Sequence, residues 1–237
     1  MAFIDELKAY SKEYGLVLTE AQLQDFAIYY DRVVTTNEAM NLTAITEAKE
    51  FALKHIIDSL SCYDTQYLGK KILDLGTGAG FPGVPLGIYD RSLTITLFDS
   101  LQKRLTFLDQ VTNELQLDGL TTLHGRAEDK AHEAAYREAF DAVTSRAVAR
   151  LPILLEWALP YIKVGGYFVA LKGLLAQEEV EESEKALKVL GGKIEEIREI
   201  TLPTLSDKRA IIYIKKVAPT PKKYPRKPKE IKTKPLV

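Results

Sequence analysis

Two spacings of apolar residues divide the chain near residue 66. Between residues 19 and 63, apolar side chains recur at intervals of three and four, which predicts amphipathic helices. The first helix follows Thr19-Glu20-Ala21-Gln22, a sequence with the spacing of a capping box. A second helix is expected from Glu47 to about Tyr63, with most of its apolar residues on one face. The N-terminal part is therefore predicted to be helical.

From residue 71 the pattern changes to short apolar runs that alternate with helical stretches. The expected strands are Lys71–Leu75, Leu93–Phe98, Thr121–His124, Phe140–Thr144 and Tyr167–Leu171. The expected helices lie near 83–88, 101–116, 127–136, 148–162 and 176–190. Such alternation predicts an α/β fold, in which a parallel sheet carries helices on both faces.

Two more strands are expected near the C-terminus, at about Ile194–Ile200 and Ala210–Lys216. The connection between them is too short for a crossover helix, so they should pair antiparallel. The sheet is thus predicted to have seven strands, mostly parallel, with an antiparallel terminal strand. Residues 217–237 hold five of the ten prolines and show no apolar period, which predicts an extended tail.

These patterns predict three parts. They are an N-terminal helical element (1–66), a cofactor-binding α/β domain (67–217) and a basic tail rich in proline and lysine (218–237). The tail should be removable without loss of cofactor binding.

Composition limits the class of protein. The N-terminus lacks the features of a signal peptide, and no run approaches the ~18 apolar residues of a membrane span. Cys62 is the only cysteine, and the three histidines lack the spacing of metal ligands. A cytoplasmic protein without metal or membrane partner is therefore expected.

The formal net charge of −1 hides an uneven distribution. Residues 207–237 contain eleven basic and two acidic residues, a balance of +9, whereas the rest contains 21 basic and 31 acidic residues, a balance of −10. A basic end on an acidic body suggests attraction to a polyanion. A solubilising tail is an equally good interpretation.

A glycine-rich turn follows the first predicted strand. The strand contains Asp74, and glycines stand at 76, 78 and 80 before a helix. Glycine permits sharp turns and close approach of a ligand, and open α/β sheets bind ligands at this edge. Because the sequence also fits a dinucleotide fingerprint, NAD and S-adenosyl-L-methionine compete as cofactors.

Two carboxylates bear on that choice. Asp99 ends the next strand and suits either cofactor, because a carboxylate accepts hydrogen bonds from both ribose hydroxyls. Asp74 would repel a pyrophosphate, whereas it would attract the ammonium group of S-adenosylmethionine. We therefore expect S-adenosylmethionine.

Several short segments along nearly the whole chain resemble the glucose-inhibited division protein B family. They are Asn41-Leu42-Thr43, His55-Ile56-Ile57-Asp58-Ser59-Leu60, the loop from Asp74 to Gly83, Phe98-Asp99-Ser100 with Lys103-Arg104, Gly125-Arg126-Ala127-Glu128, Ser145-Arg146-Ala147 and Lys222-Lys223-Tyr224-Pro225-Arg226.

The resemblance implies a Rossmann-like methyltransferase that acts on N7 of guanine 527 in 16S ribosomal RNA, alone or within the small ribosomal subunit. It implies cofactor contacts at Gly76, Phe81, Ala127, Glu128 and Arg146. With the loop and strand-end residues, the expected cofactor site is Asp74, Gly76, Gly78, Gly80, Phe81, Asp99, Ala127, Glu128 and Arg146.

The residues that would act on a substrate are harder to predict. The chain lacks the Asn/Asp-Pro-Pro-aromatic pattern after the fourth strand, and Cys62 is not in the Pro-Cys context of cytosine-C5 enzymes. Guanine N7 needs neither, because its lone pair is unprotonated. The substrate-side candidates are His55, Asp58, Arg146 and Lys172, although the first two also fit a helix-surface ion pair or a packing pair.

Two alternative functions remain open from the sequence. One is a nicotinamide-dependent oxidoreductase, which Asp74 and the lack of a second substrate domain disfavour. The other is a non-catalytic ribosome-assembly factor, which would have no need of the intact glycine turn and Asp99.

Overall fold

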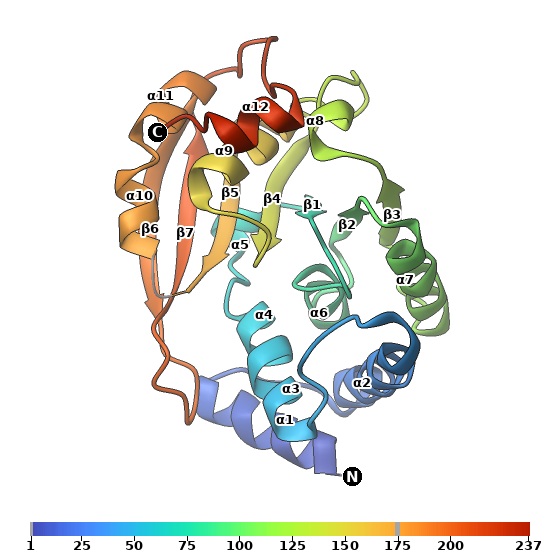
Figure 1. Ribbon diagram of the computed structural model, residues 1–237. Helices are drawn as coiled ribbons and strands as arrows, with labels where there is room; N and C mark the ends of the chain where they lie inside the picture. The colour runs from blue at the N-terminus through green and yellow to red at the C-terminus, as the bar shows by residue number, and fades with distance from the viewer. Residues whose placement is uncertain (1, 174–175) are drawn as a thin grey trace.

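The computed structural model describes residues 2–173 and 176–237, and its centre is one seven-stranded sheet (Figure 1). The strands are β1 (Lys71–Leu75), β2 (Thr94–Asp99), β3 (Leu120–His124), β4 (Phe140–Arg146), β5 (Ile162–Lys172), β6 (Gly192–Ile200) and β7 (Arg209–Lys216). Their order is β3-β2-β1-β4-β5-β7-β6. Neighbours among β1–β5 are parallel, whereas β7 is antiparallel to both β5 and β6. The predicted seven-stranded, mostly parallel α/β sheet is confirmed.

Helices cover both faces of the sheet. They are α6 (Gly83–Tyr89), α7 (Gln102–Glu114), α8 (Ala127–Lys130), α9 (Leu151–Ala158), the 3-10 turn η2 (Leu159–Tyr161), α10 (Ala176–Glu181), α11 (Glu184–Leu190) and α12 (Pro228–Thr233). Successive strand residues face opposite sides. Ile72 accordingly packs in one apolar cluster with α6 and α7, and Leu73 in another with α9 and α11.

Some predicted helix boundaries were wrong. The helix expected over 127–136 ends at Lys130, where the Arg137 guanidinium takes the carbonyl of Ala131 at 3.1 Å. The helix expected over 148–162 begins only at Leu151, with a proline in its first turn. The helix expected over 176–190 is split into α10 and α11. The side-chain hydrogen bond from Arg137 leaves no trace in residue spacing.

The N-terminal helices are α1 (Ala2–Tyr14), α2 (Glu20–Met40), α3 (Ala48–Phe51), η1 (Ala52–Ile57), α4 (Asp58–Leu60) and α5 (Thr65–Leu68). The predicted capping box at Thr19 is present in full. Segment η1 is a π-helix inside the helix expected from Glu47, and such wide turns are frequent at functional sites. Residues of α1, α2 and η1 share one apolar cluster with the sheet, and the three-part division stays a prediction.

The C-terminal segment is not the extended tail that its composition suggested. Tyr224, Ile231 and Leu236 are buried, and α12 contacts α9 (Figure 1). These three apolar residues are too far apart in sequence to form a recognisable period, yet each fills a place on the body. Arg226 forms a two-pronged ion pair with the fully buried Glu156, with contacts of 2.9 and 2.7 Å.

We expect Arg226→Ala to lower the free energy of unfolding by about 3–5 kcal/mol, because it leaves the Glu156 carboxylate buried without its cationic partner. The matched control is Lys227→Ala, since Lys227 is exposed, and its effect should stay within about 0.5 kcal/mol. Denaturant unfolding of both variants measures the difference. Equal stabilities would mean that the segment is not held by this ion pair.

Candidate cofactor and substrate site

A cavity of about 460 Å³ opens where β1 and β2 end. Its lining includes the predicted cofactor residues Gly76, Gly78, Phe81, Asp99, Ala127, Glu128 and Arg146. The structure thus brings together side chains from the glycine turn and from the ends of β2, β3 and β4. This convergence follows from the parallel order of the strands, which places their carboxyl ends at one edge.

Asp74 and Gly80, which were also predicted to contact the cofactor, do not line this cavity. At Gly80, with φ of +111°, a Cβ would lie 2.6 Å from Val84 and 2.8 Å from the Tyr29 hydroxyl. Gly80 therefore permits close packing of the turn against α2 and α6. A glycine at position 80 is thus required for packing. The sequence pattern alone could not distinguish this requirement from contact with a ligand.

Asp74 is fully buried beneath the turn. Its carboxylate accepts hydrogen bonds from Thr77 Oγ1 at 2.6 Å, from the Gly83 amide at 3.0 Å and from Thr144 Oγ1 at 3.1 Å. Burial raises the pKa of Asp74 to about 6, and the three hydrogen bonds oppose that rise. This carboxylate holds the turn from below and does not line the cavity, so its attraction for the cofactor's ammonium group would act through the turn and stays a prediction.

Asp99 lies at the cavity wall as expected. Its carboxylate accepts hydrogen bonds from the amides of Gly78 at 3.1 Å and Leu101 at 2.9 Å, and it lies 3.3 Å from Arg104. A carboxylate offers about four lone-pair sites, so capacity remains for a ligand hydroxyl. Asp99 thus both anchors the tip of the glycine turn and faces the cavity.

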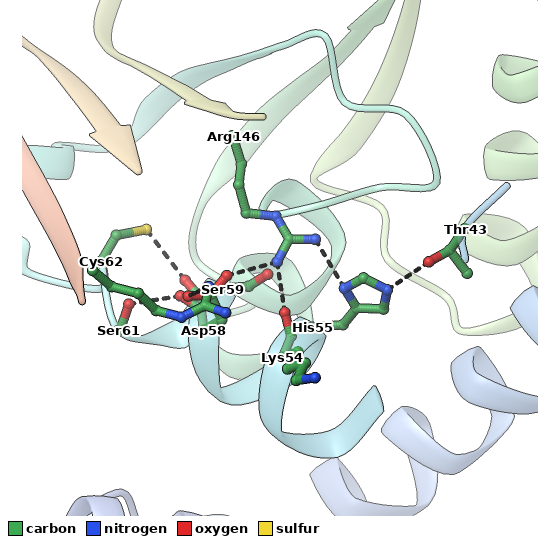
Figure 2. Close-up of polar contacts among 9 residues, drawn as sticks. Thr43, Lys54, His55, Asp58, Ser59, Ser61, Cys62 and Arg146 are labelled. Carbon is green, nitrogen blue, oxygen red and sulfur yellow. Dashed lines mark hydrogen bonds and ion pairs between the residues drawn. The ribbon is translucent and has the colours of Figure 1, made fainter. Parts of the chain in front are cut away.

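Arg146, at the end of β4, joins the sheet to the N-terminal helices (Figure 2). Its Nη1 donates to the Lys54 carbonyl at 2.9 Å and to Asp58 Oδ2 at 2.8 Å, and its Nη2 lies 3.0 Å from His55 Nδ1. The guanidinium stands 4.8 Å from the centre of the Phe81 ring. Three of its five donors are engaged in these contacts, which leaves two for a bound molecule.

His55 stacks on Phe81 with ring centres 4.2 Å apart, and its Nε2 lies 2.8 Å from Thr43 Oγ1. Burial, assisted by the charge of Arg146, lowers the pKa of His55 to about 3. The imidazole is therefore neutral at physiological pH. Both of its nitrogens have hydrogen-bond partners, as Figure 2 shows.

The four substrate-side candidates all line a second cavity of about 520 Å³, which shares His55, Arg146 and Ala147 with the first. Asp58 accepts from both Arg146 and Arg209, and Lys172 pairs with Glu179 at 2.6 Å. The alternative that His55 and Asp58 form a helix-surface ion pair is wrong, because both are buried and both contact Arg146. The alternative that they are a packing pair stays open.

Several lining residues were missed by the sequence interpretation. Thr43, Trp157 and Lys232 line the first cavity, and Arg209 lines the second. Thr43 precedes the helix expected from Glu47, and Lys232 belongs to the segment expected to be an extended tail. The only signal for Thr43 was its place in Asn41-Leu42-Thr43, and nothing in residue spacing marks Trp157 or Arg209.

Within 2–173 and 176–237, no three His, Cys, Asp or Glu side chains are grouped so as to hold a metal ion. In that part of the chain, no helix has both the length and the apolar character needed to cross a bilayer.

The strand order, the antiparallel β7 and the cavity at the glycine turn together define a Rossmann-like methyltransferase that depends on S-adenosyl-L-methionine. Solved structures support this fold. Pyrococcus horikoshii TYW2 in complex with MeSAdo has a TM-score of 0.54 at 14% identity, over 68% of this chain and 62% of that one. Precorrin-6y C5,15-methyltransferase from Geobacter metallireducens has a TM-score of 0.50 at 14% identity, over 75% and 92%.

Sequence comparison identifies the particular family. The family model described as rRNA small subunit methyltransferase G, also called GidB, matches residues 22–211. The protein of that name from Desulfitobacterium hafniense is 53% identical over 94% of this chain and 93% of the relative. The one from Clostridium tetani is 43% identical over the whole of both chains. The chain belongs to the rRNA small subunit methyltransferase G family, which confirms the resemblance.

The depressed pKa of His55 predicts a pH-dependent loss of stability. In the unfolded chain His55 takes up a proton as the pH falls below 6.5, whereas in the folded chain it stays neutral until about pH 3. The unfolded state therefore binds more protons in this range, and the free energy of unfolding falls as the pH falls from 6.5 to 3. The difference in unfolding free energy between the native chain and His55→Gln should shrink by roughly 2 kcal/mol between pH 6.5 and 4.5. Denaturant unfolding at several pH values measures it, and a constant difference would contradict the assignment of a neutral, buried His55.

Proposed function

We propose that this protein transfers the methyl group of S-adenosyl-L-methionine to N7 of a guanine in 16S ribosomal RNA, the family target being guanine 527. The observation that carries the choice of N7 is the state of the side chains where the two cavities meet. Both nitrogens of His55 are engaged, and Asp58 is held between Arg146 and Arg209. Neither is a free proton acceptor.

N7 methylation suits such a site. The N7 lone pair attacks the sulfonium methyl, the carbon–sulfur bond breaks, and its electron pair stays on sulfur, so the positive charge moves to the base. No proton has to leave the base before attack. Catalysis then rests on in-line placement of N7 and on the partial exclusion of water.

We place the cofactor in the first cavity. Asp99 would accept a hydrogen bond from a ribose hydroxyl, and the Glu128 carboxylate, which is buried at the wall, would accept from the adenine amino group. The two donors left on Arg146 would hold the carboxylate at the methionine end. Asp74 and Gly80 support the turn in this arrangement and do not touch the cofactor.

We place the target guanine where the two cavities meet, beside His55 and Arg146, with Lys172 and Arg209 on the walls of the second cavity. Exposed lysines of the C-terminal segment would extend RNA contact outward, because Lys232 lies at the mouth of the first cavity and Lys227 and Lys229 are on the same segment. Lys216 contributes no such contact. It is fully buried, and burial lowers its pKa to about 8. The exposed lysines of the C-terminal segment would contact phosphates of the RNA, whether the substrate is RNA alone or the small ribosomal subunit.

Gly78→Ala tests the cofactor position. A Cβ at Gly78 meets no protein atom closer than 4.0 Å, so it would project into the cavity at the cost of roughly 1–2 kcal/mol for a φ of +60°. We expect at least a tenfold rise in Kd for S-adenosylhomocysteine, about 1.4 kcal/mol. Calorimetry with this ligand and with NAD measures both.

Gly80→Ala is the matched control, because its Cβ would meet Val84 and Tyr29 within the protein. Gly80→Ala should be less stable to unfolding than Gly78→Ala, because overpacking costs about 1–3 kcal/mol. Binding of NAD, or an unchanged Kd in Gly78→Ala, would refute the proposed position of the cofactor.

The site of methylation is testable with labelled cofactor and small-subunit RNA. N7 methylation makes the glycosidic bond labile, so treatment with borohydride and aniline should cut the RNA at the modified base. Cys62→Ala should keep full activity, because Cys62 is buried outside both cavities and burial raises the pKa of its thiol. Label at N1, N2 or C5, or a dead Cys62→Ala variant that remains folded, would refute the proposal.

A further inference from the structure

We propose that Thr43 donates its hydroxyl proton to an acceptor oxygen of a molecule bound in the first cavity, and so positions that molecule for methyl transfer. The inference deepens the proposed function and rests on it. Thr43 precedes α3 and lines the cavity beside Leu42, His55 and Phe81. Its role follows from the direction of each hydrogen bond in the chain from Arg146 to Thr43.

Arg146 fixes the direction of its hydrogen bond with His55. A guanidinium has donors only, so His55 Nδ1 must accept the hydrogen bond from Arg146 Nη2 at 3.0 Å. The ring is neutral, because burial beside this cation lowers its pKa to about 3. A neutral imidazole carries one N–H. That hydrogen is therefore on Nε2, and His55 donates it to Thr43 Oγ1 at 2.8 Å.

The same hydroxyl oxygen accepts a second hydrogen bond, from the Ile45 amide at 3.0 Å. A hydroxyl has two lone pairs and one hydrogen, so both acceptor positions are taken and the hydrogen remains. Among residues 2–173 and 176–237, no group is positioned to accept it. The backbone of Thr43 is itself held, since its amide donates to Asn37 Oδ1 at 2.8 Å. The remaining direction is the cavity.

The chemistry selected is an oxygen with a free lone pair. Two groups at the reactive end would supply one, namely guanine O6, which lies beside N7 on the same edge of the base, and the carboxylate of the cofactor's methionine end. A bond to O6 would orient N7 toward the methyl group. It would also discriminate against adenine, which presents an amino donor at that position.

The test uses two partial ligands with Thr43→Val, which removes the hydroxyl but keeps the branched shape. The first is small-subunit RNA with 2-aminopurine at the methylated position, a base that keeps N7 and lacks O6. If O6 is the acceptor, this replacement lowers kcat/KM at least tenfold with the native chain and by less than threefold with Thr43→Val. The conservative Thr43→Ser should behave as the native chain does.

The second pair is S-adenosylhomocysteine and 5′-methylthioadenosine, which lacks the carboxylate. If the carboxylate is the acceptor, Thr43→Val weakens only the first, by about tenfold in calorimetry. Either result supports the proposal and names the source of the oxygen. Equal losses for guanine and 2-aminopurine, together with unchanged selectivity between the two adenosine ligands, would overturn it and leave Thr43 a structural support of His55. The calorimetric arm needs no RNA, so it stands even if the RNA substrate proves wrong.

Discussion

The site depends on one buried carboxylate. Asp74 lies in β1 and accepts hydrogen bonds from the glycine turn, from the first residue of α6 and from β4, so it ties three segments to one point. Without these bonds, a charge in a fully buried position would cost several kcal/mol. A Cβ at Gly83 would lie 2.7 Å from its Oδ2. The turn is held because any displacement would leave this carboxylate without partners.

Arg146 plays the corresponding part between the sheet and the N-terminal helices. It binds Asp58 and the carbonyl of Lys54, fixes the tautomer of His55 and packs against Phe81. The helical element thereby becomes one wall of both cavities. Because Asp58 also binds Arg209 from β7, the ends of β4 and β7 are coupled to a single residue of α4. Arg146 therefore sets both the tautomer of His55 and the position of the N-terminal helices relative to the sheet.

The C-terminal segment shows how composition can mislead. Prolines and lysines indicated a free tail, yet Arg226 meets a buried glutamate, and three apolar side chains anchor the rest. As a consequence, Pro228 and Lys232 line the same cavity as the glycine turn. The segment is therefore a wall of the site as well as a source of positive charge. The expectation that it can be removed without effect on the cofactor loses its structural basis.

The sequence by itself predicted the seven strands, the parallel pairing up to β5, the antiparallel pairing of the last two strands and the glycine turn, because these follow from local periodicity, from a short connection and from the spacing of glycines. The order of the strands, with β7 between β5 and β6, was decided by the tertiary structure. The sequence also indicated four residues of the cavity wall, because they follow the ends of neighbouring parallel strands at one edge of the sheet. They are Asp99, Ala127, Glu128 and Arg146. Only the tertiary structure decided that Asp74 faces inward, that Thr43, Trp157 and Lys232 line the cavity, and that His55 is neutral. Each of these depends on a partner at least a dozen residues away or on burial, and neither is encoded in the spacing of neighbouring residues.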